Sequence, residues 1–348
     1  MERMVLGRTG LETYRLGLGG IPIQRVSEAE ALETVGHALE LGVDFIDTSR
    51  MYTTSERRIG LALKRAGIDG DGRYVVIASK SQAKTAGAMR ADLETSLREL
   101  QRDYIDIYKC HFVTDQADYD RVTSPGGALE ALQKARAEGL IGYLGISSHS
   151  LEVLDRALDD DLFDVIMVCF SLLETRARDA LIPKARDRNV GVLAMKPFSG
   201  GVIEEARLAL KYALAEPGVL VVAGVEYPEL FDENWRVFQE GGALTDAERR
   251  RVEGIRQAND KVFCRRCGYC QPCTEDIPIA TILGVRSLVK RMGLETFRGG
   301  FLWGGVEKAR NCTACGECMA RCPYELPIPD LIRENLEWLD EQVRNQSA

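Results

Sequence analysis

Short apolar, β-rich runs alternate with helical stretches along roughly the first 240 residues. The helical stretches, for example 88–101, 128–139 and 177–189, repeat apolar residues at i, i+3 and i+4. This alternation indicates βαβ units in a parallel sheet, because a parallel connection needs a crossover that is usually a helix. After a hairpin around MVLGRTGLETYRL, the predicted strands are LGLGG (16–20), VDFIDTS (43–49), YVVIAS (74–79), YIDIYKC (104–110), IGYLGIS (141–147), FDVIMVCF (163–170), VGVLAM (190–195) and VLVVAG (219–224).

Eight strands, each followed by a helix, match an α/β fold of the (β/α)₈ barrel type in number and size. The rival is a doubly wound open sheet, which needs a GxGxxG fingerprint at its first strand–helix turn. The segment LGLGGIPIQ does not supply this fingerprint before a helix. We therefore expect a TIM barrel.

The pattern changes after the barrel. Thr245 is placed to cap a linking helix, and from residue 261 onward there are cysteine clusters on either side of 281–297, then a closing helix at 331–343. We predict two domains: a barrel over 1–244, and a linker helix with a small, mainly helical domain over 245–348. Such a small core needs a metal group to stabilise it.

Composition narrows the function classes. The 348 residues are 45% hydrophobic and 28% charged with a net charge of −8, which excludes nucleic acid as an expected partner. The N-terminus lacks a signal-peptide core, and the longest apolar run, 219–225, is too short to span a bilayer. We therefore expect a cytoplasmic protein without membrane contact, whose ten cysteines are metal ligands or redox groups more than disulfides.

Eight of the cysteines form two tightly spaced runs. CTACGECMARCP has the C-x₂-C-x₂-C-x₃-C-P spacing of bacterial ferredoxins, and CRRCGYCQPC is a variant one residue shorter, with Thr274 in place of the proline. Two complete ligand sets predict two [4Fe–4S] clusters. Two C-x₂-C pairs also bind zinc, but zinc leaves half of the thiols unexplained or needs two cramped sites. The ligands are Cys264, Cys267, Cys270, Cys273, Cys312, Cys315, Cys318 and Cys322.

The ferredoxin precedent implies that the two runs interlock, since the fourth cysteine of each run ligates the other cluster. Cys322 is then expected to join Cys264, Cys267 and Cys270 at one cluster. Cys273 joins Cys312, Cys315 and Cys318 at the other. The remaining thiols, Cys110 and Cys169, lie inside predicted strands and are expected to be small buried apolar residues.

Polar residues close three successive strands of the predicted barrel. Asp47 ends the second strand, Tyr52 follows it, Lys80 ends the third strand and His111 follows the fourth. Chemistry in a TIM barrel lies at the carboxyl ends of the strands, so these side chains are expected to converge. Tyr52 would be the acid, Lys80 would lower its pKa, Asp47 would hold the lysine, and His111 would orient a carbonyl oxygen.

These residues carry a resemblance to a known family. FIDTSRMYTTSE, IASK, LETSLRELQRDYIDIYKCH, GISSH and VGVLAMKPFSGG resemble the aldo-keto reductases over nearly the whole first 240 residues. The cysteine-rich tail resembles the iron–sulfur branch of that family. The resemblance implies hydride transfer between a nicotinamide and a carbonyl or alcohol substrate, with Asp47, Tyr52, Lys80 and His111 as the catalytic tetrad.

Cofactor positions also follow from the resemblance. KPFSGG matches a loop over the pyrophosphate, and AGVEYPELFDEN matches the phosphate and adenine loop. Glu226 stands where a 2′-phosphate would be repelled, which favours NAD(H) over NADP(H). The implied cofactor-binding residues are Ser147, Ser171, Lys196, Pro197, Phe198, Gly200, Gly201, Gly224, Glu229 and Asn234.

The nicotinamide subsite departs from the family pattern. Met167 and Ser171 stand where the family has glutamine and asparagine for the carboxamide, and Met195 stands where an aromatic ring stacks. Three hypotheses follow: a nicotinamide-linked oxidoreductase with accompanying clusters, a reductase fed through its clusters by a ferredoxin or flavoprotein without nicotinamide, and a non-catalytic electron-transfer subunit. The intact tetrad argues against the third. Substrate identity, a flavin and the oligomeric state are not determined by the sequence.

Overall fold

The computed structural model describes residues 2–68 and 74–347. The chain divides into two compact units. One unit is Met1–Ser199 with Ile203–Glu248, and the other is Gly200–Val202 with Arg249–Ala348. A short stretch of the loop KPFSGG thus belongs to the second unit, although the loop starts in the first.

The first unit is a closed barrel of eight parallel strands in the order β10-β3-β4-β5-β6-β7-β8-β9. Each strand lies within one of the predicted runs, apart from a residue or two at the ends of β5 and β7, so the predicted (β/α)₈ barrel is confirmed. An antiparallel hairpin of β1 (Arg3–Val5) and β2 (Glu12–Tyr14) precedes it, as expected. The barrel strands are β3 (Leu16–Gly19), β4 (Phe45–Asp47), β5 (Val76–Ser81), β6 (Ile105–Cys110), β7 (Ile141–Ser148), β8 (Val165–Cys169), β9 (Gly191–Met195) and β10 (Val219–Gly224).

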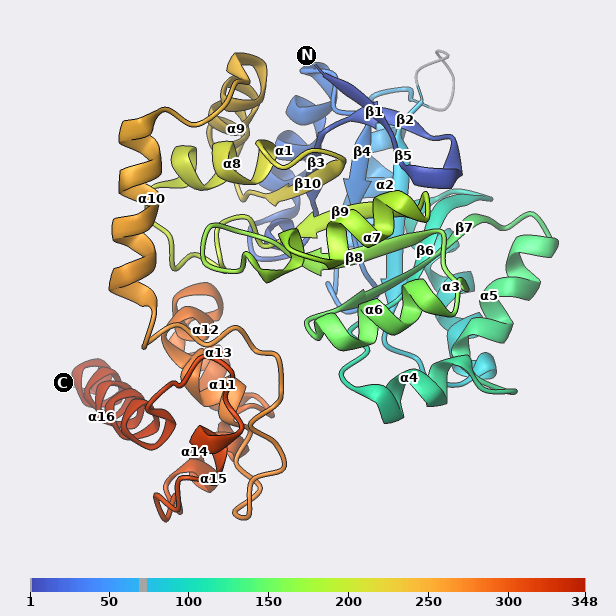
Figure 1. The fold of residues 1–348 in the computed structure, drawn as a ribbon. Helices are drawn as coiled ribbons and strands as arrows, with labels where there is room; N and C mark the ends of the chain where they lie inside the picture. The colour runs from blue at the N-terminus through green and yellow to red at the C-terminus, as the bar shows by residue number, and fades with distance from the viewer. Residues whose placement is uncertain (1, 69–73, 348) are drawn as a thin grey trace. The chain divides into compact units, whose positions relative to one another are not determined.

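Helices connect the strands and lie outside them in Figure 1. Their caps follow from local sequence: the Ser27 side chain accepts from the backbone N–H of Glu30 while the Glu30 carboxylate accepts from the N–H of Ser27. The helices of this unit are α1 (Glu28–Glu40), α2 (Ser55–Arg65), α3 (Ala86–Leu100), α4 (Gln116–Thr123), α5 (Ala128–Ala137), α6 (Leu151–Asp159), α7 (Leu181–Asp187), α8 (Ala206–Leu214) and α9 (Pro228–Glu240).

The barrel interior is built in layers. Phe45, Ala78 and Ile107 belong to its buried apolar cluster. Side chains two positions further along a strand lie on the same face. The next inward positions on β4, β5 and β6 are therefore 47, 80 and 109, and all three carry charged side chains. A charged layer thus lies directly above an apolar one, toward the carboxyl ends of the strands.

Helix α10 (Asp246–Asn259) carries the chain into the second unit. Thr245 caps it as predicted: its hydroxyl accepts from the N–H of Glu248 at 3.2 Å, and the Glu248 carboxylate accepts from the N–H of Thr245 at 2.7 Å. The described residues of the second unit form helices and loops. The helices are α11 (Ile279–Leu283), α12 (Val285–Met292), α13 (Leu294–Gly299), α14 (Trp303–Ala309), α15 (Glu317–Ala320) and α16 (Ile328–Ser347).

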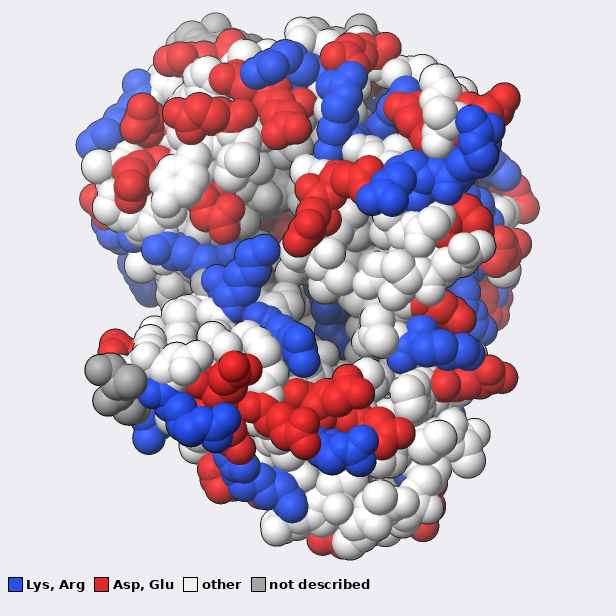
Figure 2. Space-filling view, turned by 90° about the vertical axis from the view of Figure 1, so that its left-hand side faces the viewer, with Lys and Arg blue, Asp and Glu red and all other residues white. Residues whose placement is uncertain are grey.

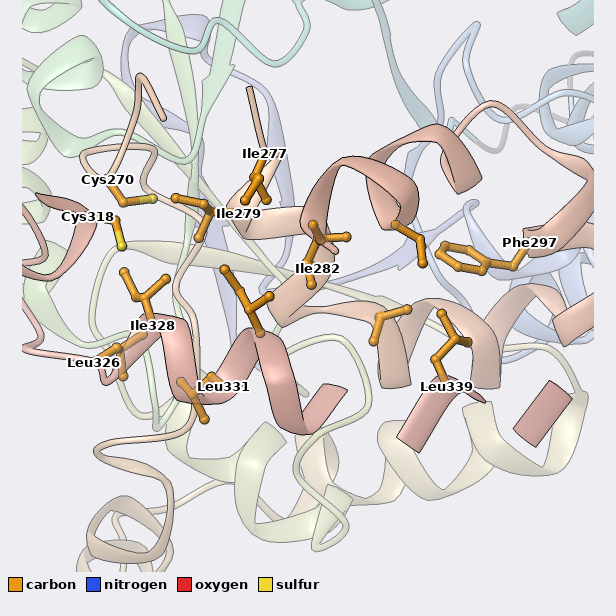
Figure 3. Close-up of a cluster of buried hydrophobic side chains, with 14 of the residues drawn as sticks. Cys270, Ile277, Ile279, Ile282, Phe297, Cys318, Leu326, Ile328, Leu331 and Leu339 are labelled. Atoms are coloured by element: carbon orange, nitrogen blue, oxygen red, sulfur yellow. The ribbon is translucent and has the colours of Figure 1, made fainter. Parts of the chain in front are cut away.

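An apolar core joins the helices of the second unit. Figure 3 shows Cys270 and Cys318 at one end of this core, close to Ile279, with Phe297 toward the other end. Both thiols are buried at 8% and 9% exposure. One cysteine of each run is therefore packed into the core of this unit.

The protein surface carries charges of both signs. Figure 2 shows basic and acidic side chains interspersed on the face it presents. Among the residues that the structure describes, no helix combines the length and apolar character needed to cross a membrane.

The contact between α2 and α3 depends on one glycine. A Cβ at Gly60 would lie 2.6 Å from the backbone carbon of Leu100, whereas a Cβ at Gly36 in α1 meets nothing within 4 Å. We expect Gly60→Ala to lower the free energy of unfolding by about 1–3 kcal/mol, because backbone must move. Gly36→Ala is the matched control and should raise it by up to about 1 kcal/mol. Urea unfolding of both variants measures the difference, and equal stabilities would contradict the close packing.

Candidate active site and cysteine cavities

Asp47, Lys80 and Tyr52 converge at the carboxyl ends of the strands, as the sequence predicts. The Lys80 ammonium donates to Asp47 Oδ1 and to the carbonyl oxygen of Thr48 at 2.8 Å. Lys80 Nζ also lies 4.8 Å from the centre of the Tyr52 ring. The two hydrogen bonds hold the lysine beside the tyrosine.

A second lysine, which sequence reasoning missed, occupies the other oxygen of Asp47. Lys109 Nζ donates to Asp47 Oδ2 at 2.5 Å, and Lys109 is fully buried. One carboxylate thus lies between two ammonium groups, Lys80 and Lys109, at 3% exposure of its own. The signal available in the sequence was a lysine inside an otherwise apolar predicted strand, two positions before His111.

The neighbouring charges in this group shift the pKa of each member. Burial by itself raises the pKa of Asp47, but the neighbouring Lys109 and Lys80 charges prevail and hold it below its usual value. Burial lowers the pKa of Lys80, yet Asp47 and Tyr52 outweigh this and raise it. Burial lowers the pKa of Lys109 to about 8; the Asp47 charge raises this pKa, but the Lys80 charge lowers it. Asp47 and Lys80 are therefore ionised at neutral pH.

Tyr52 corrects one expectation. The sequence argument held that Lys80 lowers the tyrosine pKa, and the lysine does act in that direction. Burial of the phenol is the larger effect, and with the help of the Asp47 charge it raises the pKa of Tyr52 above 10.0. Tyr52 is therefore a protonated phenol at neutral pH, which is the state that a proton donor requires.

His111 completes the predicted set. Its ring lies 6.0 Å from that of Tyr52, edge to face, and its Nδ1 lies 3.0 Å from Ser49 Oγ. Burial, followed by the lysine charges, lowers the pKa of His111 well below 6.5, so the ring is neutral. A neutral ring has one N–H. Ser49 Oγ also lies 3.0 Å from the carbonyl oxygen of Lys80, so its one hydrogen goes either to that oxygen or to Nδ1. In the second case Nε2 carries the ring hydrogen and can donate it to a carbonyl oxygen.

One of the predicted cofactor positions has a feature of a ligand site. Asn234 in α9 is 4% exposed, and its Nδ2 has no hydrogen-bond partner among the described residues. Gly224 is instead packed within the protein, since a Cβ there would lie 2.8 Å from the ring of Pro22. Glu229 lies exposed in the first turn of the same helix. A buried amide donor of this kind fits an acceptor on a bound molecule.

Other predicted positions are engaged within the protein. Ser171 Oγ lies 2.7 Å from Ser199 Oγ and accepts from the N–H of Glu174. Ser147 Oγ accepts from the N–H of Phe112 at 3.0 Å. Lys196 Nζ lies 2.6 Å from His149 Nε2.

The loop KPFSGG is divided between the two units. Pro197 is buried and Phe198 half-buried in the barrel unit. Gly200 and Gly201 belong to the second unit, where the Gly200 carbonyl accepts from the Ser287 hydroxyl at 2.7 Å. The role of these four residues in binding a pyrophosphate stays a prediction.

The expected preference for NAD(H) loses its physical basis. It assumed that the Glu226 carboxylate is free to repel a 2′-phosphate. Arg25 Nη1 instead lies 2.9 Å from Glu226 Oε1, so the carboxylate is neutralised by an ion pair. Met167 is 2% exposed and belongs to the apolar interior of the barrel, and Met195 packs against it.

The cysteines surround two cavities in the second unit. One small cavity is lined by Cys264, Cys267, Cys270 and Cys322. A second small cavity is lined by Cys273, Cys312, Cys315 and Cys318. Each cavity therefore takes three thiols from one run and one thiol from the other, the grouping that the interlocked arrangement predicts.

The two cavities differ in the charged residues that line them. Arg265 lines the first cavity, and its guanidinium lies 4.3 Å from the centre of the Tyr324 ring. Glu275, Glu317 and Arg321 line the second. Burial raises the pKa of Cys264 to about 11 and that of Cys270 to about 12. Without a bound cation these thiols stay protonated.

The two cysteines outside the runs are buried as expected. Cys110 and Cys169 are 1% and 8% exposed in β6 and β8. Burial raises the pKa of Cys110 to about 12, so its thiol is unreactive at neutral pH.

Comparison with known proteins agrees with the barrel. Residues 13–208 match the aldo/keto reductase family, and the chain belongs to that family. It is 30% identical over 220 residues to L-galactose dehydrogenase of Arabidopsis thaliana, covering 59% of this chain and 68% of that protein. The resemblance stated from the tetrad and strand motifs is thereby confirmed for the family. Its iron–sulfur branch stays a prediction.

Solved structures show the same fold. An aldo-keto reductase from Bacillus halodurans in its holo form is 25% identical with a TM-score of 0.62, covering 73% of this chain and 96% of that one. An aldo-keto reductase from Klebsiella pneumoniae in complex with NADPH is 23% identical with a TM-score of 0.61, covering 73% and 95%. The cofactor named for the second protein gives the expected NAD(H) preference no support.

Asp47 carries the electrostatic balance of the site. We expect Asp47→Asn to lower the free energy of unfolding by about 3–5 kcal/mol, since two buried ammonium groups would lose their only shared carboxylate. Asp161→Asn, which removes an exposed partner of Arg8, is the control and should leave the urea midpoint nearly unchanged. Equal effects of the two substitutions would show that the buried group does not matter to stability.

Proposed function

We propose that this protein is a nicotinamide-dependent oxidoreductase that interconverts a small carbonyl compound and its alcohol in the barrel, and that carries two [4Fe–4S] clusters. The observation that carries the catalytic part is the convergence of Asp47, Lys80, Tyr52 and His111 at one end of the barrel. The sugar named for the Arabidopsis relative, L-galactose, is a substrate of this chemical class.

The four residues have separate roles in the proposed reaction. His111 donates a hydrogen bond to the carbonyl oxygen, and Tyr52 gives that oxygen its proton. Lys80 stabilises the tyrosinate that remains, and Asp47 holds Lys80 in place. A reduced nicotinamide, when bound, supplies the hydride to the carbonyl carbon. Tyr52 fits its role because its raised pKa keeps it protonated before the step.

The fit of a nicotinamide cofactor is supported by residues that follow β10. Asn234 presents a buried amide donor that has no partner among the described residues. The first turn of α9 adds backbone N–H groups that favour a phosphate. We propose that either NADH or NADPH can be accepted, with NADPH favoured by the Klebsiella relative and permitted by the Arg25–Glu226 ion pair.

The cluster part of the proposal is supported by the two cavities. Four thiols lining each cavity match the ligand number of a [4Fe–4S] cluster. In the described part of the chain, no three His, Cys, Asp or Glu side chains converge closely enough to hold a single metal ion. The grouping of the thiols, three from one run and one from the other around each cavity, is the arrangement of a two-cluster ferredoxin and supports clusters over zinc.

Tyr52→Phe tests the proton donor. We expect the variant to lose at least about a hundredfold in carbonyl reduction with NADPH, because the general acid is removed while the ring stays. Tyr74→Phe is the control, since Tyr74 is exposed and lies before β5, at the amino end of the strand. Steady-state rates against a panel of aldehydes and ketones measure both. Turnover by the wild type with reduced clusters but not with either nicotinamide would instead support the reductase fed through its clusters.

Metal content tests the clusters. Protein purified without oxygen should hold about eight iron and eight sulfide per chain, four of each for each cluster. Cys322→Ser should impair the same cluster as Cys267→Ser, and Cys273→Ser the same cluster as Cys315→Ser, as judged by EPR of the dithionite-reduced protein. Zinc without sulfide would rule out the proposal, and pairing within each run would rule out the interlocked arrangement.

A further inference from the structure

Lys109 lies in the charged layer of the barrel, beside the proposed catalytic group. In the strand register it is paired with Lys80 on β5 and with Gly145 on β7. Its side chain is fully buried, and its ammonium group donates to Asp47 Oδ2 at 2.5 Å. It is thus one carboxylate away from Lys80 and Tyr52.

The barrel makes room for this lysine at Gly145. A Cβ at position 145 would lie 2.5 Å from Lys109 Cγ and 3.2 Å from its Cδ. The aliphatic stem of Lys109 therefore occupies the space that a side chain on β7 would fill. The second ammonium group is built into the packing of two neighbouring strands.

A purely structural role does not explain the charge. Asp47 and Lys80 already form a neutral buried pair, and Lys109 adds a positive charge that no second carboxylate of the described residues pairs with. Burying such a charge costs folding free energy. The lowered pKa of Lys109, about 8, reflects that cost. An uncharged side chain of similar length would fill the same space without it.

We propose that Lys109 is a positioning residue of the reaction, whose charge, passed through Asp47, makes Tyr52 a stronger proton donor. The inference rests on the proposed carbonyl reduction. Its physical content is the net charge of the buried group formed by Asp47, Lys80, Lys109 and Tyr52.

The proton balance shows the effect. In reduction the Tyr52 O–H bond breaks, its proton goes to the carbonyl oxygen, and the hydride from the reduced nicotinamide supplies the electron pair to the carbonyl carbon. With Lys109 charged, the net charge of the group falls from +1 to 0. With Lys109 neutral it falls from 0 to −1, which is costlier in a buried site. The neutral His111 adds no charge in either case.

The pH dependence follows with a definite sign. The titratable groups facing Lys109 are Asp47 from β4, Lys80 from β5, and beyond them Tyr52 and His111; Gly145 on β7 contributes none. Lys109 is charged below a pH of about 8 and neutral above it. Carbonyl reduction should therefore slow as the pH rises through about 8.

Lys109→Met and Lys109→Gln test the inference in the full-length protein. We expect both to slow the single-turnover rate of carbonyl reduction at pH 7 by about tenfold to a hundredfold, as if the pKa of Tyr52 rose by one to two units. The rate loss near pH 8 should disappear, and KM for the nicotinamide should stay the same. Lys134→Met, an exposed lysine on α5, is the matched control and should behave as the wild type.

Two outcomes would overturn the inference. The first is an unchanged rate and pH profile in Lys109→Met, and the second is a rate restored by glutamine, which would assign Lys109 a hydrogen-bonding role alone. A measurement of the Tyr52 pKa, which needs no turnover, distinguishes failure of this inference from failure of the proposed function. In ¹³Cζ-tyrosine NMR, with Tyr52→Phe to assign the signal, the pKa of Tyr52 should rise in Lys109→Met even if no carbonyl compound is reduced. An unchanged Tyr52 pKa would refute the inference about Lys109 even in protein that shows no turnover.

Discussion

The ionic contact of Asp47 with two buried ammonium groups is the constraint on which the active site depends. Lys80 and Lys109 each take one oxygen of this carboxylate, and Lys80 in turn reaches Tyr52. Such a group is expensive to bury, so it is held only where neighbouring strands bring all partners into one layer. The closed barrel provides that layer directly above apolar side chains. Excluding water strengthens the interactions between these charges, and burial keeps the phenol protonated.

The second unit is organised by a different constraint. Its cysteines surround two cavities that each draw thiols from both runs, and Cys270 and Cys318 lie at one end of an apolar core. The helices α11 to α14 separate the two runs along the chain. A group bound in each cavity would therefore link the segments before and after these helices. Buried thiols with raised pKa values bind a metal only by losing their protons. Folding and cluster assembly are therefore coupled under the proposed function.

The two units are suited to different electron chemistry. A nicotinamide transfers electrons in pairs, whereas an iron–sulfur cluster transfers them singly. The charged residues lining the cavities also differ: Arg265 lines the first, while Glu275, Glu317 and Arg321 line the second.

The sequence by itself determined the eight strands, the hairpin and the Thr245 cap, because these depend on local periodicity. The family and the grouping of the cysteines followed from motifs that resemble those of known proteins. It also identified Asp47, Tyr52, Lys80 and His111, since strand ends are readable along the chain. Only the tertiary structure decided the rest. The role of Lys109 needs the register between β5, β6 and β7, the raised pKa of Tyr52 needs its burial, and the Arg25–Glu226 ion pair joins residues 201 positions apart. Burial and pairing between distant segments arise only when the barrel closes.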